Sequence, residues 1–203
     1  MTIQEIFTSL KSKCDESRSI IAAVNTSDYL ADDQQRTIRD FVVKQAFINV
    51  VTEWEHFLEN TTIAYSLGES SIKGNRPKRF VLPIDAEHSN KIITSATQYF
   101  DWTDMTKVLN LENTFFENGL PYTTALNGFS SKYKNIKKIR NYIVHNSKKS
   151  RDEFDTLVRT ELSPSQVGIS PAEFLLSKKG SNPLFYFVYT RHIENAAQII
   201  AEY

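Results

Sequence analysis

Three side chains within a six-residue stretch have the chemistry of a site that cleaves phosphodiesters: Arg140, Asn141 and His145. A histidine accepts and donates protons near neutral pH, an arginine carries a permanent positive charge, and an asparagine orients neighbours by hydrogen bonds. We therefore interpret residues 139–146 as a candidate ribonuclease site. In this interpretation His145 moves a proton and Arg140 stabilises negative charge on phosphorus.

Arg140 occupies an unusual position on the helix that its neighbours predict. On a helical wheel it falls in the middle of the apolar face, between Ile136 and Ile143. A guanidinium there needs a carboxylate partner or a wet cleft, and Glu53, at the edge of another apolar helix face, is the partner that we predict. Arg140 and His145 are about 140° apart on an ideal helix, so they converge only if the long arginine stem and the last turn allow it.

His145 is expected in the last turn of this helix, which should stop near Asn146. The partial negative charge at a helix C-terminus favours a protonated histidine, which is a better proton donor.

A basic segment surrounds these residues, although the whole chain has no net charge. No acidic residue occurs between Gly119 and Arg151, so any attraction to a phosphate backbone is local. The residues predicted to bind RNA are Lys134, Lys137, Lys138, Lys148, Lys149 and Arg151. Tyr133 and Tyr142 are candidates for stacking on bases. The alternative is that these cations form an ordinary solvated helix face.

The composition favours a single all-α domain over residues 1–203. Only six glycines and six prolines occur in 203 residues, which argues against a loop-rich β fold. The lone Cys14 excludes an internal disulfide and a thiolate metal cluster, and it is expected in the core. We expect no metal and no cofactor. Without a signal-like or membrane-spanning stretch, we expect a cytoplasmic protein.

Apolar spacing and capping signals predict the order of the helices. The predicted helices cover about residues 3–24, 38–68, 87–99, 103–116 and 121–146, with later ones opened by Ser150, Ser170 and Asn182. The second helix has an apolar band wide enough to contact several helices or a second subunit. Two alternatives stay open: the basic loop 73–79 either touches phosphates or only connects helices, and residues 185–187 fit a helix or a strand.

The run Arg140-Asn141-Tyr142-Ile143-Val144-His145, at the end of a late helix, resembles the Arg-x4-6-His signature of the HEPN superfamily, in which an asparagine often follows the arginine. Residues 53–59, on the long helix, are similar to the second helix of toxin- and defence-type members such as the RiboL-PSP group. The resemblance covers about residues 33–147. It implies an all-α bundle with one long central helix and a four-helix core, followed by a helical extension over about residues 150–203.

The resemblance implies a metal-independent endoribonuclease that acts as a homodimer. Paired motif helices would form a cleft where the ribose 2′-OH attacks phosphorus, with Asn141 orienting the substrate or His145, and Glu53 and Tyr142 in support. It also implies a toxin or antiviral defence context, RNA as partner, and a regulatory protein or antitoxin. Some such toxins have a modifiable tyrosine two residues after the histidine, where this chain has Ser147.

Two hypotheses from other classes stay open beside the ribonuclease. The first is a catalytically silent HEPN module that binds nucleic acid or a nucleotide through the same patch. The second is a helical protein whose wide apolar faces serve only assembly.

Overall fold

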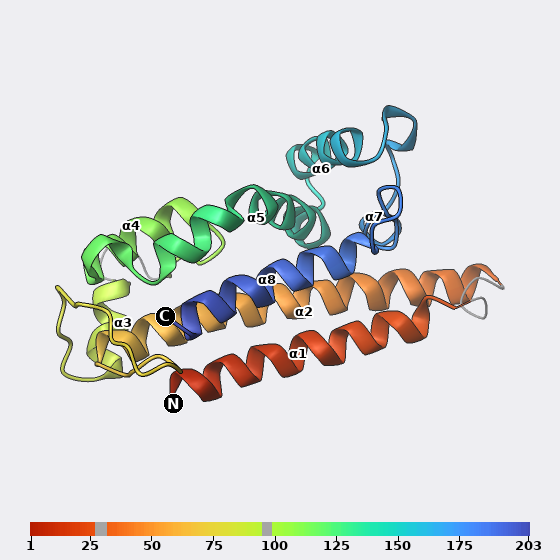
Figure 1. The fold of residues 1–203 in the computed structure, drawn as a ribbon. Helices are drawn as coiled ribbons and strands as arrows, with labels where there is room; N and C mark the ends of the chain where they lie inside the picture. The colour runs from red at the N-terminus through yellow and green to blue at the C-terminus, as the bar shows by residue number, and fades with distance from the viewer. Residues whose placement is uncertain (27–31, 95–98) are drawn as a thin grey trace. The chain divides into compact units, whose positions relative to one another are not determined.

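A computed structural model of the chain describes residues 1–26, 32–94 and 99–203 (Figure 1). The helices are α1 (Ile3–Val24), α2 (Asp33–Ser66), α3 (Ala86–Ile93), α4 (Met105–Phe115), the 3-10 turn η2 (Glu117–Gly119), α5 (Tyr122–His145), α6 (Lys148–Glu161), the 3-10 turn η3 (Pro164–Gln166), α7 (Pro171–Leu175) and α8 (Phe185–Ala201). Within these residues the only β pairing is an isolated bridge between Arg79 and Phe116, which confirms the predicted all-α class. None of the described helices has both the length and the apolar character needed to cross a bilayer.

The described residues form two compact units, each built from discontinuous segments. The first unit comprises Met1–Ser12, Glu53–Ser131 and Ile193–Tyr203, and the second comprises Lys13–Thr52 and Lys132–His192. Helices α1, α2, α5 and α8 each contribute one part to each unit. Both units therefore draw on the predicted core and on the predicted C-terminal extension. The single domain over 1–203 stays a prediction.

Aromatic side chains fill the core of the first unit. The ring of Trp54, on α2, stacks on Phe57 at 5.5 Å and meets Phe129 of α5 edge-on at 5.8 Å. Tyr65, further along α2, donates a hydrogen bond to the carbonyl of Ile200 in α8 at 2.7 Å. Aromatic pairs of this kind add to the stabilisation from apolar burial. The aromatic pair with Phe129 joins α2 to α5, and the hydrogen bond from Tyr65 joins α2 to α8.

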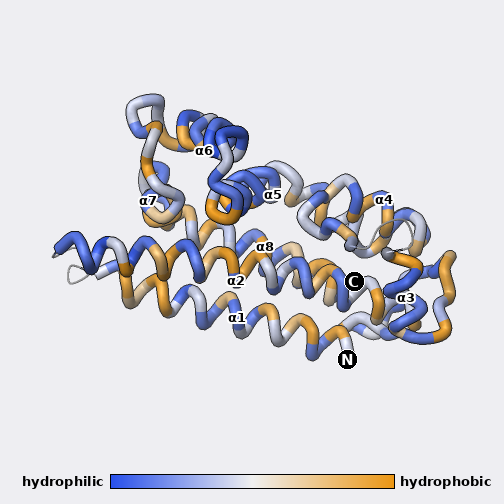
Figure 2. The backbone as a smooth tube through the Cα atoms, turned by 180° about the vertical axis from the view of Figure 1, so that it is seen from behind, coloured by the Kyte–Doolittle hydropathy of each residue, from blue (hydrophilic) through white to orange (hydrophobic). Residues whose placement is uncertain are grey.

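A chain of aromatic contacts holds the second unit together. Phe154 of α6 meets Phe174 of α7 edge-on at 5.6 Å, and Phe174 stacks on Phe185 of α8 at 4.7 Å. Ser17 of α1 and Tyr186 of α8 share a buried hydrogen bond. Figure 2 shows α6 mostly in hydrophilic colours, so its few buried apolar side chains carry its packing. Helix α8 begins at Phe185, so residues 185–187 form its first turn and not a strand.

The ends of the first helices agree closely with the predictions because capping is local. Helix α1 has the predicted bounds, and α2 ends just before Gly68, which has φ +96°. The N–H groups of Gly68 and Glu69 bond to the carbonyls of Tyr65 and Ala64, a glycine-type helix stop. The helix predicted at 87–99 ends earlier, because α3 stops at Ile93 with Thr94 as its C-cap. Residues 27–31 of the predicted break at 25–33, and residues 95–98, lie outside the described residues.

Three later boundaries differ from the predictions. Helix α4 begins at Met105 because the Asp104 carboxylate accepts the N–H groups of the first turn. Helix α6 begins at Lys148, and the capping box predicted from Ser150 is wrong: Ser147 is the N-cap, and its partner in the box is Ser150. Helix α8 begins at Phe185, after the predicted Asn182 opening. The Ser170 box before α7 is confirmed.

The basic loop 73–79, in the first unit, uses its cations within the fold. Arg79 donates to the Ser66 carbonyl at the end of α2, at 2.9 Å, and its guanidinium lies over Gly68. The other three cations have partners close by: Lys73 with Glu202, Arg76 with Ser70, and Lys78 with Glu117. These contacts favour the connector interpretation of the loop over a role in phosphate binding.

A fully buried carboxyl group lies between helices in the first unit. Glu112 of α4 accepts a hydrogen bond from the Thr62 hydroxyl at 2.6 Å, and its other oxygen has no hydrogen-bond partner among the described residues. Burial raises the pKa of the Glu112 carboxyl well above its ordinary value, while the Thr62 hydrogen bond opposes that shift. The folded chain therefore keeps this group protonated at pH values where the unfolded chain ionises it.

We expect Glu112→Gln to remove part of the pH dependence of stability. The protonated carboxyl contributes fully below its unfolded pKa of about 4.3, and its contribution is lost as pH rises toward the raised folded pKa, by up to about 1.4 kcal/mol per pH unit. Urea unfolding between pH 4 and 8 should show the variant gaining stability over the wild type as pH rises. Thr114→Ala, on the exposed side of α4, should give a difference that is the same at every pH; a constant difference for Glu112→Gln would contradict the prediction.

Candidate ribonuclease site at the end of helix α5

Helix α5 ends directly after the candidate catalytic histidine, as predicted. His145 is its last residue, and Asn146 turns the backbone with φ +42°, in the left-handed region. The N–H of Asn146 still bonds to the Tyr142 carbonyl at 3.1 Å, so the final turn is intact. His145 is exposed at this end and its ring is free to meet a ligand from solvent.

The structure brings Arg140 and His145 together within one chain. Arg140 Nη1 lies 3.3 Å from His145 Nε2 and 3.5 Å from Asn141 Oδ1, to which it donates a hydrogen bond. The flexible arginine stem spans the large angle between the two positions on the helix. All three predicted catalytic side chains therefore meet at one place.

The contact between Arg140 and His145 sets a condition on the imidazole. A guanidinium has only donors, so His145 Nε2 must be unprotonated to accept the hydrogen bond. The protonated His145 expected from the helix end stays a prediction.

Arg140 sits where the apolar face of α5 leaves the protein core. Ile136 and Tyr133, one and two turns earlier, are buried, whereas Arg140 and Ile143 are half-buried and Val144 is 49% exposed. Arg140 is therefore partly exposed to solvent, which lowers the cost of a charge on this face.

Glu53, the predicted partner of Arg140, belongs to the first unit. It lines a small pocket with Met1, Ile6 and Leu10 at the start of the chain. The side-chain partners of Arg140 come from its own helix. An ion pair between Glu53 and Arg140 stays a prediction.

All the residues predicted to bind RNA lie in the second unit with the motif. Lys137 and Lys138 are half-buried, and the exposed cations are Lys134, Lys148, Lys149 and Arg151. The segment is acid-free in sequence but not in space, because Glu161 of α6 accepts a hydrogen bond from Asn135 of α5 at 3.2 Å. An acidic residue therefore lies close to this part of α5, although the segment itself contains none.

Tyr133 and Tyr142, the two tyrosines predicted to stack on bases, pack against the protein. Tyr133 is only 2% exposed, so the prediction that it stacks on bases is wrong: it belongs to the core. Tyr142 is half-buried, with the Phe154 ring 5.1 Å away and the Arg151 guanidinium 5.8 Å from its ring centre. Arg151 also donates to Asn146 Oδ1 at 3.4 Å. Tyr142 thus holds α6 against the end of α5.

A pocket of about 390 Å³ lies beside the motif and was missed from the sequence. Its lining residues are Lys44, Tyr142, Ile143, Asn146, Gly168, Ile169, Ser170, Pro171 and Glu173. Among these residues, only those of α5 were predicted from the sequence to belong to a functional site, while Ser170 was predicted only to begin a helix. Lys44 and the loop before α7 come from distant parts of the chain, and no local pattern marks them as part of a site.

In the three described ranges, no group of three or more histidine, cysteine, aspartate or glutamate side chains is placed to hold a metal ion. Cys14 is fully buried in α1, which confirms its predicted place in the core. Ser147, at the position of the modifiable tyrosine in some HEPN toxins, caps α6 through its hydroxyl.

We expect Asn146→Ala to lower the free energy of unfolding by about 1 kcal/mol, because alanine is strained in the left-handed conformation. Asn146→Gly should cost less, since glycine lacks the Cβ that causes the strain. Chemical denaturation measures both. Asn127→Ala, at an exposed position inside α5, is the control and should not destabilise the chain. Equal losses for the alanine and glycine variants would show that backbone strain at Asn146 is not the constraint.

Comparisons with protein-family models, with curated proteins and with solved structures found no match to this chain. The likeness to the HEPN superfamily therefore rests on the residues at the end of α5 and on the helical context around them.

Proposed function

We propose that the chain is a HEPN-type, metal-independent endoribonuclease that works as a homodimer in the cytoplasm. The observation that carries the proposal is the contact between Arg140 Nη1 and His145 Nε2, at 3.3 Å, at an exposed helix end. The basic residues around it supply attraction for an RNA backbone. The HEPN-like arrangement of the helices and the toxin or defence setting, with a regulatory protein or antitoxin as partner, belong to the same proposal.

The chemistry follows from the two side chains. When a bound phosphate draws the Arg140 guanidinium away from it, His145 Nε2 takes the proton from the ribose 2′-OH, and the 2′-oxygen attacks the adjacent phosphorus. Arg140 stabilises the negative charge on the pentacovalent phosphorus. The bond from phosphorus to the 5′-oxygen breaks, and the leaving oxygen takes a proton, giving a 2′,3′-cyclic phosphate and a 5′-hydroxyl. Asn141 orients Arg140 through its side-chain oxygen.

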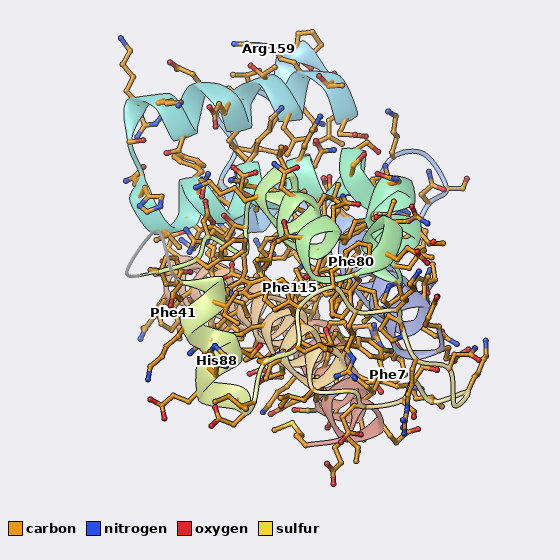
Figure 3. The ribbon with its side chains drawn as sticks, turned by 90° about the vertical axis from the view of Figure 1, so that its left-hand side faces the viewer. Phe7, Phe41, Phe80, His88, Phe115 and Arg159 are labelled. Atoms are coloured by element: carbon orange, nitrogen blue, oxygen red, sulfur yellow. The ribbon has the colours of Figure 1, made fainter. Side chains whose placement is uncertain are left out.

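A dimer supplies the second proton-transfer group that one motif histidine per chain lacks. Large apolar side chains are exposed on the second unit, where the motif lies: Phe41 is 65% exposed and Ile38 45%, both on α2, and Val144 on α5 is also uncovered. Figure 3 labels Phe41. Exposed apolar side chains favour association, because burying them removes apolar surface from water.

The test of the site is RNA cleavage by the purified protein in EDTA. We expect products with 2′,3′-cyclic phosphate ends, and a rate at least about 100-fold lower for His145→Ala, because a positioned general base contributes that much. His56→Ala, an exposed histidine of the first unit, is the matched control and should leave the rate unchanged. Cleavage by His145→Ala at the wild-type rate, above that of an empty-vector preparation, would refute the assignment.

The dimer makes a separate prediction about Phe41→Glu. A charge buried in an interface is costly, so sedimentation should show a monomer, and cleavage should fall at least about ten-fold. Leu82→Glu, which changes an equally exposed apolar side chain in the first unit, should stay dimeric and active. A dimeric and fully active Phe41→Glu would mean that this face is not the interface.

A second candidate function is a catalytically silent module that binds nucleic acid or a nucleotide. It is favoured by the engagement of His145 Nε2 with Arg140, which occupies the nitrogen needed for catalysis. Salt-dependent RNA binding without turnover, and with unchanged affinity in His145→Ala, would select this candidate. A stable oligomer without RNA binding at low salt would select an assembly protein instead.

A further inference from the structure

The pocket beside the end of α5 has the size and lining of a ligand site. Its volume of about 390 Å³ falls within the range of small-molecule pockets in proteins. One wall is the end of α5, from Tyr142 to Asn146. The other walls are Lys44 of α2 and the loop from Gly168 to Glu173. All of these residues belong to the second unit.

Several hydrogen-bond donors line this pocket. Lys44 Nζ and the Tyr142 hydroxyl have no hydrogen-bond or ion-pair partner among the described residues. Asn146 uses its side-chain oxygen for Arg151, which leaves its amide N–H groups for a ligand. These groups suit a ligand with exposed oxygen or nitrogen acceptors.

The carboxylate of Glu173 also lines the pocket. One oxygen of Glu173 accepts the N–H of Ser170 at 2.7 Å, and the other has no hydrogen-bond partner within the described ranges. The carboxylate therefore keeps acceptor capacity for ligand N–H groups. A ligand that satisfies the whole pocket needs acceptors on one edge and donors on another.

The loop wall is fixed to α2 by its own contacts. The Ser170 hydroxyl donates to the Asp40 carboxylate at 3.0 Å, and Asp40 lies one turn before Lys44 on α2. Gly168 has φ +99°, a conformation that glycine adopts without strain. The hydrogen bond between Ser170 and Asp40 therefore connects the segment that carries Glu173 to the part of α2 that carries Lys44.

We propose that this pocket binds a guanine base of RNA next to the cleaved phosphodiester. Guanine offers the acceptors O6 and N7 to a lysine, and the adjacent donors N1–H and N2–H2 to a carboxylate. Adenine presents an acceptor at N1, which a carboxylate would repel. His145 and Asn146 are consecutive, so a base in the pocket lies one nucleotide or less from a phosphate at the catalytic pair.

This inference rests on the proposed nuclease for its substrate, but binding tests it separately. The His145→Ala protein is titrated calorimetrically with GMP, IMP, AMP, CMP and UMP. GMP should bind at least about ten-fold more tightly than AMP, CMP and UMP, and IMP, which lacks the 2-amino group, more weakly than GMP. Equal affinity for GMP, AMP, CMP and UMP would overturn the proposal.

Two variants assign the contacts. Lys44→Met removes the charge of the side chain and keeps its length. Glu173→Gln removes the negative charge, and glutamine can still take the place of glutamate in the capping box of α7. Each should weaken GMP binding about ten-fold and leave CMP binding unchanged. Lys107→Met, at an exposed position of α4 in the first unit, is the matched control and should change nothing. Unchanged GMP affinity in both pocket variants would also overturn the proposal.

Mapping the cuts in a single-stranded RNA separates the pocket from the nuclease. Wild-type cuts should lie next to guanines, and Lys44→Met should cut with less preference for guanine. Cleavage without any guanine preference would overturn the pocket and leave the nuclease standing. Selective GMP binding that is lost in the pocket variants, together with no RNA cleavage, would support the pocket and overturn the nuclease.

Discussion

The left-handed residue Asn146 stops α5 one residue after His145, and the candidate site depends on this stop. Because the helix ends there, the imidazole of His145 is exposed at a free end, within 3.3 Å of the Arg140 guanidinium. The backbone turn at Asn146 places Ser147 as the N-cap of α6, so α6 begins close to Arg140 and His145 in the chain. The first turn of α6 then brings Arg151 over the ring of Tyr142.

Arg140 lies on an apolar helix face and still keeps its charge partly exposed. A cation on an apolar face is costly to bury, and its partners here are the neutral Asn141 and His145. Its partial exposure lowers that cost and leaves its charge available to a phosphate. Glu112, in the core of the first unit, differs from Arg140 because it can lose its charge. Burial raises the pKa of the Glu112 carboxyl and favours its protonated, neutral form.

The segments after α5 complete the surroundings of the motif in the second unit. The aromatic contacts from Phe154 through Phe174 to Phe185 join α6, α7 and α8, and the Ser170 hydrogen bond to Asp40 ties the loop before α7 to α2. The resemblance to HEPN proteins reaches only to about residue 147. The pocket proposed to bind guanine therefore takes part of its lining, residues 168–173, from outside the region of resemblance.

The sequence determined the helices and the presence of the motif, because periodicity and capping depend on residues within about four positions of one another. It accordingly predicted the bounds of α1, the stops at Gly68 and Asn146 and the Ser170 box, and it erred at Ser150 only by choosing the later of two nearby serines. Only the tertiary structure decided which way the Arg140 stem turns, that Tyr133 is buried, and that Lys44 and Glu173 line one pocket. These outcomes depend on packing between residues far apart in the chain, and no local pattern of residue types specifies that packing.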